Sequence, residues 1–352
     1  MELLTTPFYC SAPTPHTPPR SATQVAGLPP PMKNRFLVSF WLVTVAVNSA
    51  LAQKNPPQPP ADASSPLLVW DVAPDLRDGL PRNFRTTSDQ LKAKSGAVPS
   101  VDGLVDLHAS GSAEFTASGL KLMLAKASGP VTVFDLRQED HLFVNGEPIS
   151  WMATNNWANV GKSNEKIIAG EVARAAALKP GTQLDLADDR VKKGTSGAAP
   201  SERVTVTKVQ TEADVVAAAG AAYVRVTVTD HARPLDEEVD RFILAVRAMP
   251  ANGWAHFHCR AGKGRTTTFL ALYDILRNAP RVGLEDIVNR QSLLVGDYNL
   301  LSKEKEPGAG WKADIAADRA DFVRAFYQYS RTNPDGRPQL WSEWLKSAPD
   351  KP

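Results

Sequence analysis

The feature that most constrains this 352-residue chain is the segment His-Cys-Arg-Ala-Gly-Lys-Gly-Arg-Thr at positions 258–266. Residues 254–258 alternate large and small side chains, which predicts a buried strand. Residues 267–277 place four apolar side chains on one helical face: Phe269, Leu272, Tyr273 and Leu276. The segment is therefore expected to run from a strand end into a helix N-terminus. Such a loop presents main-chain N–H groups and the positive end of the helix dipole to an anion.

The side chains of this loop predict phosphoryl chemistry. Cys259 lies in the positive field, which should lower its pKa and keep it as a thiolate. Arg265 carries a planar pair of donors that matches two phosphate oxygens, and Thr266 can donate its hydroxyl hydrogen to the sulfur. The pattern predicts attack of the sulfur on a phosphate monoester, through a cysteinyl-phosphate that water then cleaves. Main-chain amides and Arg265 would carry the transition-state charge, so no metal or cofactor is expected.

The rest of the loop is expected to contact the bound phosphate. Gly262 and Gly264 allow the sharp, partly left-handed path that such a loop needs. The predicted substrate contacts within the loop are Arg260, Ala261, Gly262, Lys263 and Gly264. A Walker A loop is excluded, because Gly264 stands where Ser or Thr would follow the lysine. The alternatives are a buried free cysteine in a Gly-rich turn and a rhodanese-type cysteine loop.

The first 52 residues look like targeting sequence. Residues 1–31 are rich in Pro, Thr and Ser, and a basic stretch from Met32 precedes the short apolar run 36–47. Ala50-Leu51-Ala52 then resembles a signal-peptidase site. We expect translation to start at Met32, a mature chain from Gln53, and a Pro/Ala/Ser-rich linker over 53–65 before a phosphatase domain over 66–352. This predicts a periplasmic or secreted protein without stable membrane insertion after cleavage; the alternative is a membrane anchor.

Charge and cysteine content limit the partners. The chain has 40 Lys and Arg against 38 Asp and Glu; removing residues 1–52 takes away Arg20, Lys33, Arg35 and Glu2, which leaves 37 of each. A neutral mature chain does not predict a nucleic-acid partner, and any polyanion site must be a local basic patch. Cys10 lies before the cleavage site, so Cys259 would be a lone, reactive thiol.

Two further polar segments follow predicted strands. The strand 131–136 ends in Asp-Leu-Arg-Gln-Glu-Asp-His, and Asp135 is a candidate site residue because open α/β sheets keep their sites at strand ends. The strand 223–228 leads into Thr-Asp-His-Ala-Arg-Pro, followed by an amphipathic helix over 236–249. Asp230 is the candidate general acid for the leaving oxygen, and His231 could bind phosphate. The alternative is that Asp230 is an ordinary turn or cap residue.

The remaining elements are expected to surround these loops. Helices are predicted over 118–127, 165–178, 211–219, 284–294 and 313–331, and strands over 182–186 and 203–209. Residues 161–208 are expected to form an insertion with its own small sheet. Three lysines lie in a polar connection near the C-terminal helix and could bind substrate, although loose lysines usually only contact solvent: Lys303, Lys305 and Lys312.

Seven segments together resemble the cysteine phytases, the bacterial protein-tyrosine-phosphatase-like inositol polyphosphate phosphatases. They are PRNFR, DLRQEDHLFVNG, WANVG, VQTE, YVRVTVTDHARPLDEEVDRF, HCRAGKGRTTT and NRQ, and they extend over most of the chain after residue 80. The resemblance implies an α/β protein-tyrosine-phosphatase-like domain with a small partial β-barrel insertion. It also implies that Cys259 is the nucleophile, Arg265 the phosphate ligand and Asp230 the general acid.

The resemblance further implies a polyphosphorylated small-molecule substrate. Its other phosphates would be received by basic residues lining a wide pocket: Arg85, His231, Lys263, Lys303, Lys305 and Lys312. The function expected first is hydrolysis of inositol polyphosphates such as phytate. A protein-tyrosine or dual-specificity phosphatase would use the same chemistry. A non-catalytic module that binds a phosphate ligand is the alternative of another class.

Overall fold

The computed structural model describes residues 66–92, 98–188, 201–296, 298–302 and 310–347, which belong to one compact unit of the chain. The predicted start, signal peptide and linker, residues 1–65, lie outside the described part, as do Lys303 and Lys305. Among the described helices, none combines the length and the apolar character needed to cross a bilayer.

A five-stranded sheet carries the functional loops. Its spatial order is β10 (Ala222–Val228), β4 (Val131–Arg137), β11 (Trp254–His258), β3 (Ala109–Ser112) and β2 (Arg85–Thr86). The first four strands run parallel, and β2 pairs antiparallel with β3. β11 holds the central position and is buried along its whole length. Because the carboxyl ends of parallel strands open at the same edge, the loops after β10, β4 and β11 come together there.

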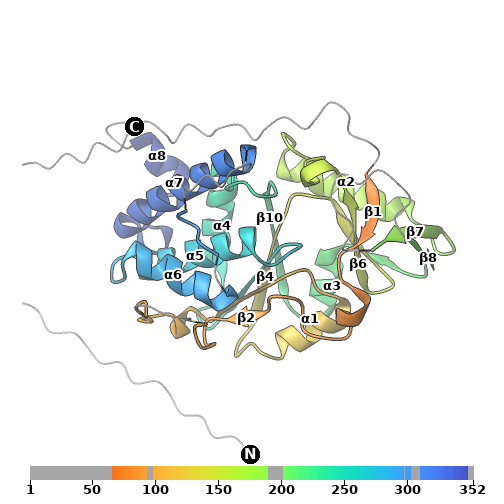
Figure 1. Cartoon of the computed structure of the whole chain (residues 1–352), viewed down its shortest axis with the longest axis horizontal. Coiled ribbons are helices and arrows are strands. Elements are labelled where there is room, and N and C mark those ends of the chain that lie inside the picture. The colour runs from red at the N-terminus through yellow and green to blue at the C-terminus, as the bar shows by residue number, and fades with distance from the viewer. Residues whose placement is uncertain (1–65, 93–97, 189–200, 297, 303–309, 348–352) are drawn as a thin grey trace, which may run out of the picture. The chain divides into compact units, whose positions relative to one another are not determined.

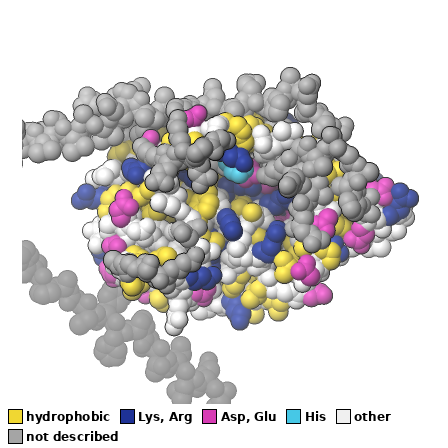
Figure 2. Space-filling model, in the orientation of Figure 1, with side chains coloured by type: hydrophobic (Ala, Val, Ile, Leu, Met, Phe, Trp, Pro, Cys, Tyr) yellow, Lys and Arg dark blue, Asp and Glu magenta, His cyan; other side chains and the backbone are white. Residues whose placement is uncertain are grey.

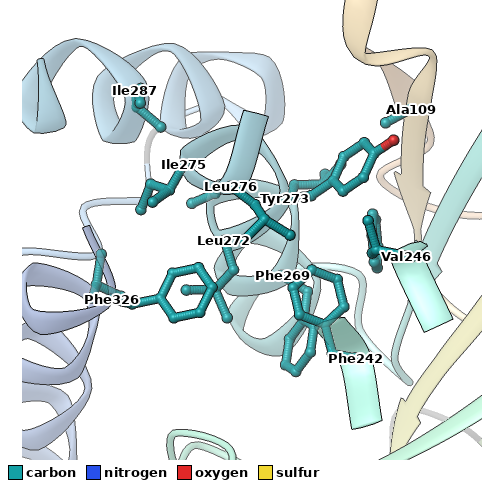
Figure 3. Close-up of a cluster of buried hydrophobic side chains, with 14 of the residues drawn as sticks. Ala109, Phe242, Val246, Phe269, Leu272, Tyr273, Ile275, Leu276, Ile287 and Phe326 are labelled. Atoms are coloured by element: carbon teal, nitrogen blue, oxygen red, sulfur yellow. The ribbon is translucent and has the colours of Figure 1, made fainter. Parts of the chain in front are cut away.

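The helices of the C-terminal half gather beside this sheet (Figure 1). They are α4 (Asp236–Ala248), α5 (Gly264–Asn278), α6 (Leu284–Val295), α7 (Trp311–Thr332) and α8 (Trp341–Ser347). Trp341 of α8 is buried and Trp344 packs against the same core. Figure 3 shows α5 in the middle of this core, with side chains from neighbouring segments facing it from several directions.

The apolar face predicted for α5 is buried, and burial extends well beyond it to most of the helix. Thr266, Thr267 and Asp274 are buried together with the predicted apolar face. The polar residues are tolerated because they are paired: Asp274 accepts hydrogen bonds from Arg290 and Gln291 of α6. The helix that starts at the cysteine loop is therefore held by apolar contacts and by a buried ion pair.

A second, six-stranded sheet lies beside the first, towards β1, β6, β7 and β8 in Figure 1. Its order is β8 (Ser201–Thr205), β7 (Gln183–Ala187), β1 (Leu67–Trp70), β6 (Glu147–Met152), β5 (His141–Val144) and β9 (Val209–Gln210). The predicted insertion, residues 161–208, supplies only β7 and β8, together with helix α2 (Asn164–Ala177). The expectation of a sheet confined to that range is therefore wrong, because β1 pairs with both β6 and β7. The partial barrel stays a prediction.

Local signals fixed several other elements correctly. Thr211 caps α3 (Glu212–Ala218) in a capping box with Asp214, and Gly220 ends that turn with a positive φ of 82°. The helix α1 (Ala117–Leu124) falls within the predicted range 118–127 apart from its first residue. Four short 3-10 turns complete the described structure: Pro74–Leu76, Val105–Leu107, Thr154–Asn156 and Pro334–Gly336.

Candidate active site

The cysteine loop connects β11 to α5, as predicted from the flanking patterns. Gly262 has a φ of 69°, and a Cβ there would lie 2.2 Å from the main-chain nitrogen of Ala113. Only glycine fits this path, both for its dihedral and for the space available. The main-chain N–H groups of residues 261–265 make no hydrogen bond to another described residue. They remain as donors at the start of α5, where an anion is favoured.

Cys259 is 2% exposed and lies at the carboxyl end of β11. The Thr266 hydroxyl donates a hydrogen bond to its sulfur over 3.2 Å. Burial opposes ionisation of the thiol, but the charge of Arg265 and the hydrogen bonds from Thr266 hold the Cys259 pKa below its usual value. The side chain is therefore poised to exist as a thiolate, the form in which cysteine is a nucleophile.

Arg265 projects from the first turn of α5 and is held by a residue that sequence reasoning missed. Its two terminal nitrogens donate to the two carboxylate oxygens of Glu139, over 2.7 and 2.9 Å. Burial favours loss of the proton, but Glu139 and Asp230 raise the Arg265 pKa above its usual value. Its Nε atom is buried and has no hydrogen-bond partner within the described part of the chain. Glu139 lies in the polar run after β4, so the run was a signal but the wrong carboxylate was chosen from it.

Asp230 lies in the loop after β10 and faces the same guanidinium, with Oδ1 3.4 Å from Arg265 Nη2. Two residues of the segment after β6 hold this loop. The Asn156 side-chain amide donates to Asp230 Oδ2 over 3.0 Å, and the Trp157 indole donates to the Asp230 carbonyl over 3.3 Å. Neither Asn156 nor Trp157 was predicted as a site residue, although both belong to the Trp-Ala-Asn-Val-Gly neighbourhood singled out in the sequence.

His231 follows Asp230 in the left-handed region, with a φ of 72° and a side chain that is 42% exposed. Its ring meets Trp311 of α7 edge to face, with centroids 5.7 Å apart, and the Arg319 guanidinium donates to its carbonyl. The thiol and the arginine of the cysteine loop and the carboxylate of the loop after β10 thus converge on one place. Figure 2 shows Lys and Arg side chains, and a His, near the middle of this view of the molecule.

The chain is similar to known proteins. A family model for PTP-like phytases, described by the words inositol hexakisphosphate, matches residues 134–277. The solved PTP-like phytase of Bdellovibrio bacteriovorus is 37% identical, with a TM-score of 0.67, and the match covers 82% of this chain and 97% of that one. The chain belongs to the PTP-like phytase family.

Two larger relatives extend the comparison. The PTP-like myo-inositol phosphatase of Mitsuokella multacida, solved with myo-inositol-(1,3,4,5)-tetrakisphosphate, is 36% identical, with a TM-score of 0.73 over 81% of this chain. The effector protein hopD2 of Pseudomonas syringae pv. tomato is 34% identical over 281 residues, or 79% of this chain. The chain spans only 50% of the Mitsuokella chain and 59% of the Pseudomonas relative.

Arg85 was expected to bind substrate, and in the structure it contacts the back of the cysteine loop. It is 1% exposed and donates to the Gly262 carbonyl over 2.8 Å and to the Thr267 hydroxyl over 3.0 Å. Burial lowers the Arg85 pKa to about 10, although the Cys259 thiolate opposes that shift. The guanidinium therefore supports the cysteine loop through the Gly262 carbonyl and the Thr267 hydroxyl.

Asp135 was also expected to contact substrate, and its described contacts are with other buried side chains. The side chain is fully buried and accepts a hydrogen bond from the Tyr223 hydroxyl over 2.8 Å. Arg225 Nε lies 3.0 Å from the same oxygen, Asp135 Oδ2. Burial alone would raise the Asp135 pKa, but Arg225 and His141 hold it well below its usual value. The strand-end rule selected the right edge of the sheet, but the Asp135 side chain contacts Tyr223 and Arg225 of β10 and His141 of β5.

The remaining predicted residues fall into two groups. Lys263 is exposed at the start of α5, in position to meet a ligand over the loop, and Lys312 is exposed in the first turn of α7. Arg260 instead reaches Asp71 with an Nε–Oδ1 distance of 2.7 Å, and the Ala261 carbonyl accepts a hydrogen bond from Asn83. Gly264 begins α5.

Two overlapping sets of buried side chains have donor atoms close enough to hold a metal ion. They are Glu114, His141 and Glu212, and Asp135, Glu212 and His258. Their carboxylates already face arginines: Glu114 pairs with Arg137 and Asp135 with Arg225. Both sets lie in the buried layer that also contains His258, directly before the nucleophile candidate.

Proposed function

We propose that this chain hydrolyses phosphate monoesters of inositol polyphosphates through a cysteinyl-phosphate intermediate. The single observation that carries the proposal is the convergence of the Cys259 sulfur, the Arg265 guanidinium and the Asp230 carboxylate at one strand edge. Family membership supports the substrate class, because the Mitsuokella relative was solved with an inositol tetrakisphosphate.

The proposed reaction starts with attack of the Cys259 thiolate on phosphorus. The free N–H groups of residues 261–265 and the unpartnered Arg265 Nε would bind the phosphate oxygens and stabilise their charge as the leaving oxygen departs. Asp230 would protonate that oxygen as general acid. Water would then cleave the cysteinyl-phosphate while Thr266 donates to the departing sulfur. Asp135 and Arg85 take no direct part in these steps.

We propose further that exposed basic residues around the loop receive the other phosphates of the substrate. Lys263 and Lys312 are exposed, and the His231 ring is partly exposed beside Asp230. Lys303 and Lys305 stay in the proposal on the family resemblance alone. A protein-tyrosine phosphatase is the second candidate, because the relative from Pseudomonas syringae is named an effector protein, and effectors need not act on phytate.

The decisive experiment compares purified protein on phytate and on a phosphotyrosyl peptide. The proposal expects a higher kcat/KM on phytate; the reverse preference supports the second candidate. Cys259→Ser should abolish turnover of both substrates while phytate still binds. Substantial turnover by this variant would rule out the thiolate mechanism, and binding without turnover by the wild-type protein would support a non-catalytic module.

We also propose that the protein is exported. The basic start at Met32, the apolar run 36–47 and the Ala-Leu-Ala site support a signal peptide and a periplasmic or secreted enzyme. N-terminal sequencing of protein recovered from the periplasm or medium should begin near Gln53. Recovery of uncleaved chain from the membrane fraction would favour the anchor instead.

A further inference from the structure

Arg137 lies at the centre of a buried set of charges below the cysteine loop. We call this set the Arg137 cluster; its members are Arg137, Asp71, Glu114 and Glu139. All four side chains are 3% exposed or less. Arg137 Nη1 donates to Asp71 over 2.8 Å and to Glu114 over 2.6 Å, and Nε donates to Glu139 over 3.2 Å. One guanidinium thus binds carboxylates that follow three strands, β1, β3 and β4.

Two of these carboxylates each bind an arginine of the cysteine loop. Asp71 presents Oδ2 to Arg137 and Oδ1 to Arg260, the residue after the nucleophile candidate, at 2.7 Å. Glu139 presents its oxygens both to Arg137 and, in a two-point contact, to Arg265. The chain of contacts therefore leaves the loop at Arg260, passes through Arg137, and returns to the loop at Arg265.

We propose that Arg137 is a positioning residue that fixes Arg260 and Arg265 relative to each other and so sets the shape of the phosphate-binding loop. This deepens the proposed function, on which it rests. The role needs arginine, because the planar guanidinium offers five donors in fixed directions, whereas lysine offers one freely rotating group. It also links the loop to the second sheet, since Asp71 directly follows β1 and is held there by Ser150 of β6.

The positioning role of Arg137 can be distinguished from general support of the core by comparison with Glu171. Glu171 lies in the same buried layer and binds Arg225, but none of its described contacts reaches a loop arginine. Its partner Arg225 reaches the main-chain carbonyls of Arg137 and Glu139 but no side chain of the Arg137 cluster. Glu171→Gln is therefore a control that removes a buried charge of the same kind and leaves the side-chain contacts of the Arg137 cluster in place. Glu171 has no part in the proposed catalytic or binding machinery.

The test uses the intact protein and two probes that do not depend on which substrate is natural. Orthovanadate reports binding of a pentacoordinate phosphate analogue, and the pH midpoint of iodoacetate alkylation reports ionisation of Cys259. Arg137→Lys and Arg137→Met should weaken vanadate inhibition and lower kcat by on the order of 100-fold, because small displacements of catalytic groups have costs of that size. The alkylation midpoint should rise by about one pH unit, as Arg265 moves from the sulfur.

Glu171→Gln should lose thermal stability. Its vanadate affinity should stay within about twofold of the wild type, and its alkylation midpoint within about 0.3 pH unit. If the Arg137 variants match the control in these readouts, the proposal is overturned. If the Arg137 variants fail to fold, the proposal is tested by the vanadate affinity of Asp71→Asn, Glu139→Gln and the double variant. Each carboxylate also contacts one loop arginine directly, but Arg137 joins the two, so their effects on vanadate affinity should be non-additive. Additive effects overturn the proposal. Wild-type protein that binds vanadate but has no activity on phytate would instead contradict the proposed function.

Discussion

The Thr266 hydroxyl donates its one hydrogen towards two acceptors, the Cys259 sulfur at 3.2 Å and the Ser112 carbonyl at 3.3 Å. The stronger acceptor of the two is whichever carries more negative charge. As the cysteinyl-phosphate is cleaved, charge develops on the sulfur, and the hydrogen bond should shift to it. Thr266 is therefore expected to matter most in the second half of the reaction.

Thr266→Val tests this relationship, since it replaces the hydroxyl by a methyl group of similar size. Hydrolysis of the cysteinyl-phosphate should slow by about 10- to 100-fold, the range expected for one hydrogen bond to a charged atom. Rapid mixing with p-nitrophenyl phosphate should then show a burst of product followed by a slow steady rate. Thr266→Ser keeps the hydroxyl and should restore most of the rate. A Thr266→Val variant without a burst and with a normal steady rate would show that the hydroxyl is dispensable.

Gly262→Ala should disrupt the loop more than an ordinary glycine replacement. The new Cβ would lie 2.2 Å from the Ala113 nitrogen and 2.5 Å from the Ser112 carbonyl carbon, both main-chain atoms that cannot rotate away. Loss of phosphate binding is expected, measured as the vanadate inhibition constant. The matched control is Gly181→Ala, which has a φ of 89° but nothing within 4 Å of the added atom. It should cost only about 1 kcal/mol in the free energy of unfolding and leave vanadate binding intact.

The parts of this site that the sequence predicted are those encoded over a few residues. The strand before Cys259, the helix after Thr266 and the glycine at 262 follow from local pattern, because each depends on neighbours in the chain. The helix predicted over 211–219 is observed as α3 for the same reason. The convergence of Cys259 with Asp230 followed from the rule that parallel strands open at one edge.

The parts that could not be predicted depend on which long-range partner a charged side chain finds. Glu139 and Asp135 are four residues apart in one polar run, yet only Glu139 faces the guanidinium of Arg265. The alternation of β4 and the turn after it decide this, and neither is visible before the sheets are assembled. Arg85 was assigned to the substrate from the family resemblance; its burial follows from the pairing of β2 with β3.

Arg85→Met should therefore lower stability rather than substrate affinity. It leaves the Gly262 carbonyl and the Thr267 hydroxyl without their buried donor, which should reduce the free energy of unfolding by about 2–3 kcal/mol. With the loop less well held, kcat should fall while KM for phytate changes little. Lys263→Ala is the comparison. Because Lys263 is exposed, its replacement should raise KM for phytate with no loss of stability. A raised KM with unchanged stability in Arg85→Met would restore Arg85 as a substrate ligand.

Asn156→Ala should reduce the rate in a way that depends on the leaving group. The amide fixes one oxygen of Asp230 at 3.0 Å, so its loss should misalign the proposed general acid. Inositol alkoxides are poor leaving groups and need that proton, whereas p-nitrophenolate does not. We expect kcat on phytate to fall by roughly 10- to 100-fold, with little change on p-nitrophenyl phosphate. An equal fall on both substrates would mean that Asn156 supports the loop in general and not the acid.

The buried histidine before the nucleophile predicts how stability depends on pH. His258 is fully buried and faces Glu212 of α3 at 2.8 Å, Glu114 at 3.8 Å and Asp135 at 3.9 Å. Burial favours the neutral ring, but Glu212 and Glu114 outweigh it and raise the His258 pKa from 6.5 to about 9. The folded state thus holds a proton that the unfolded chain releases near its ordinary pKa. This contribution to stability is complete below about pH 6.5 and is lost as the pH rises through about 9.

Urea denaturation between pH 6 and pH 9.5 should therefore show the free energy of unfolding decreasing as the pH rises, and His141 should add to the same trend because its pKa is also raised by nearby carboxylates. Glu212→Gln removes the carboxylate shared by both rings, whose nitrogens lie 2.8 and 2.9 Å from its oxygens. This variant should be less stable at pH 6 and should depend less on pH above it, since the rings would then hold their protons less tightly. Two results would contradict this prediction: equal stability of the wild-type protein at pH 9.5 and pH 6, or an unchanged pH slope in Glu212→Gln. Either would mean that the two histidines are neutral in the folded state.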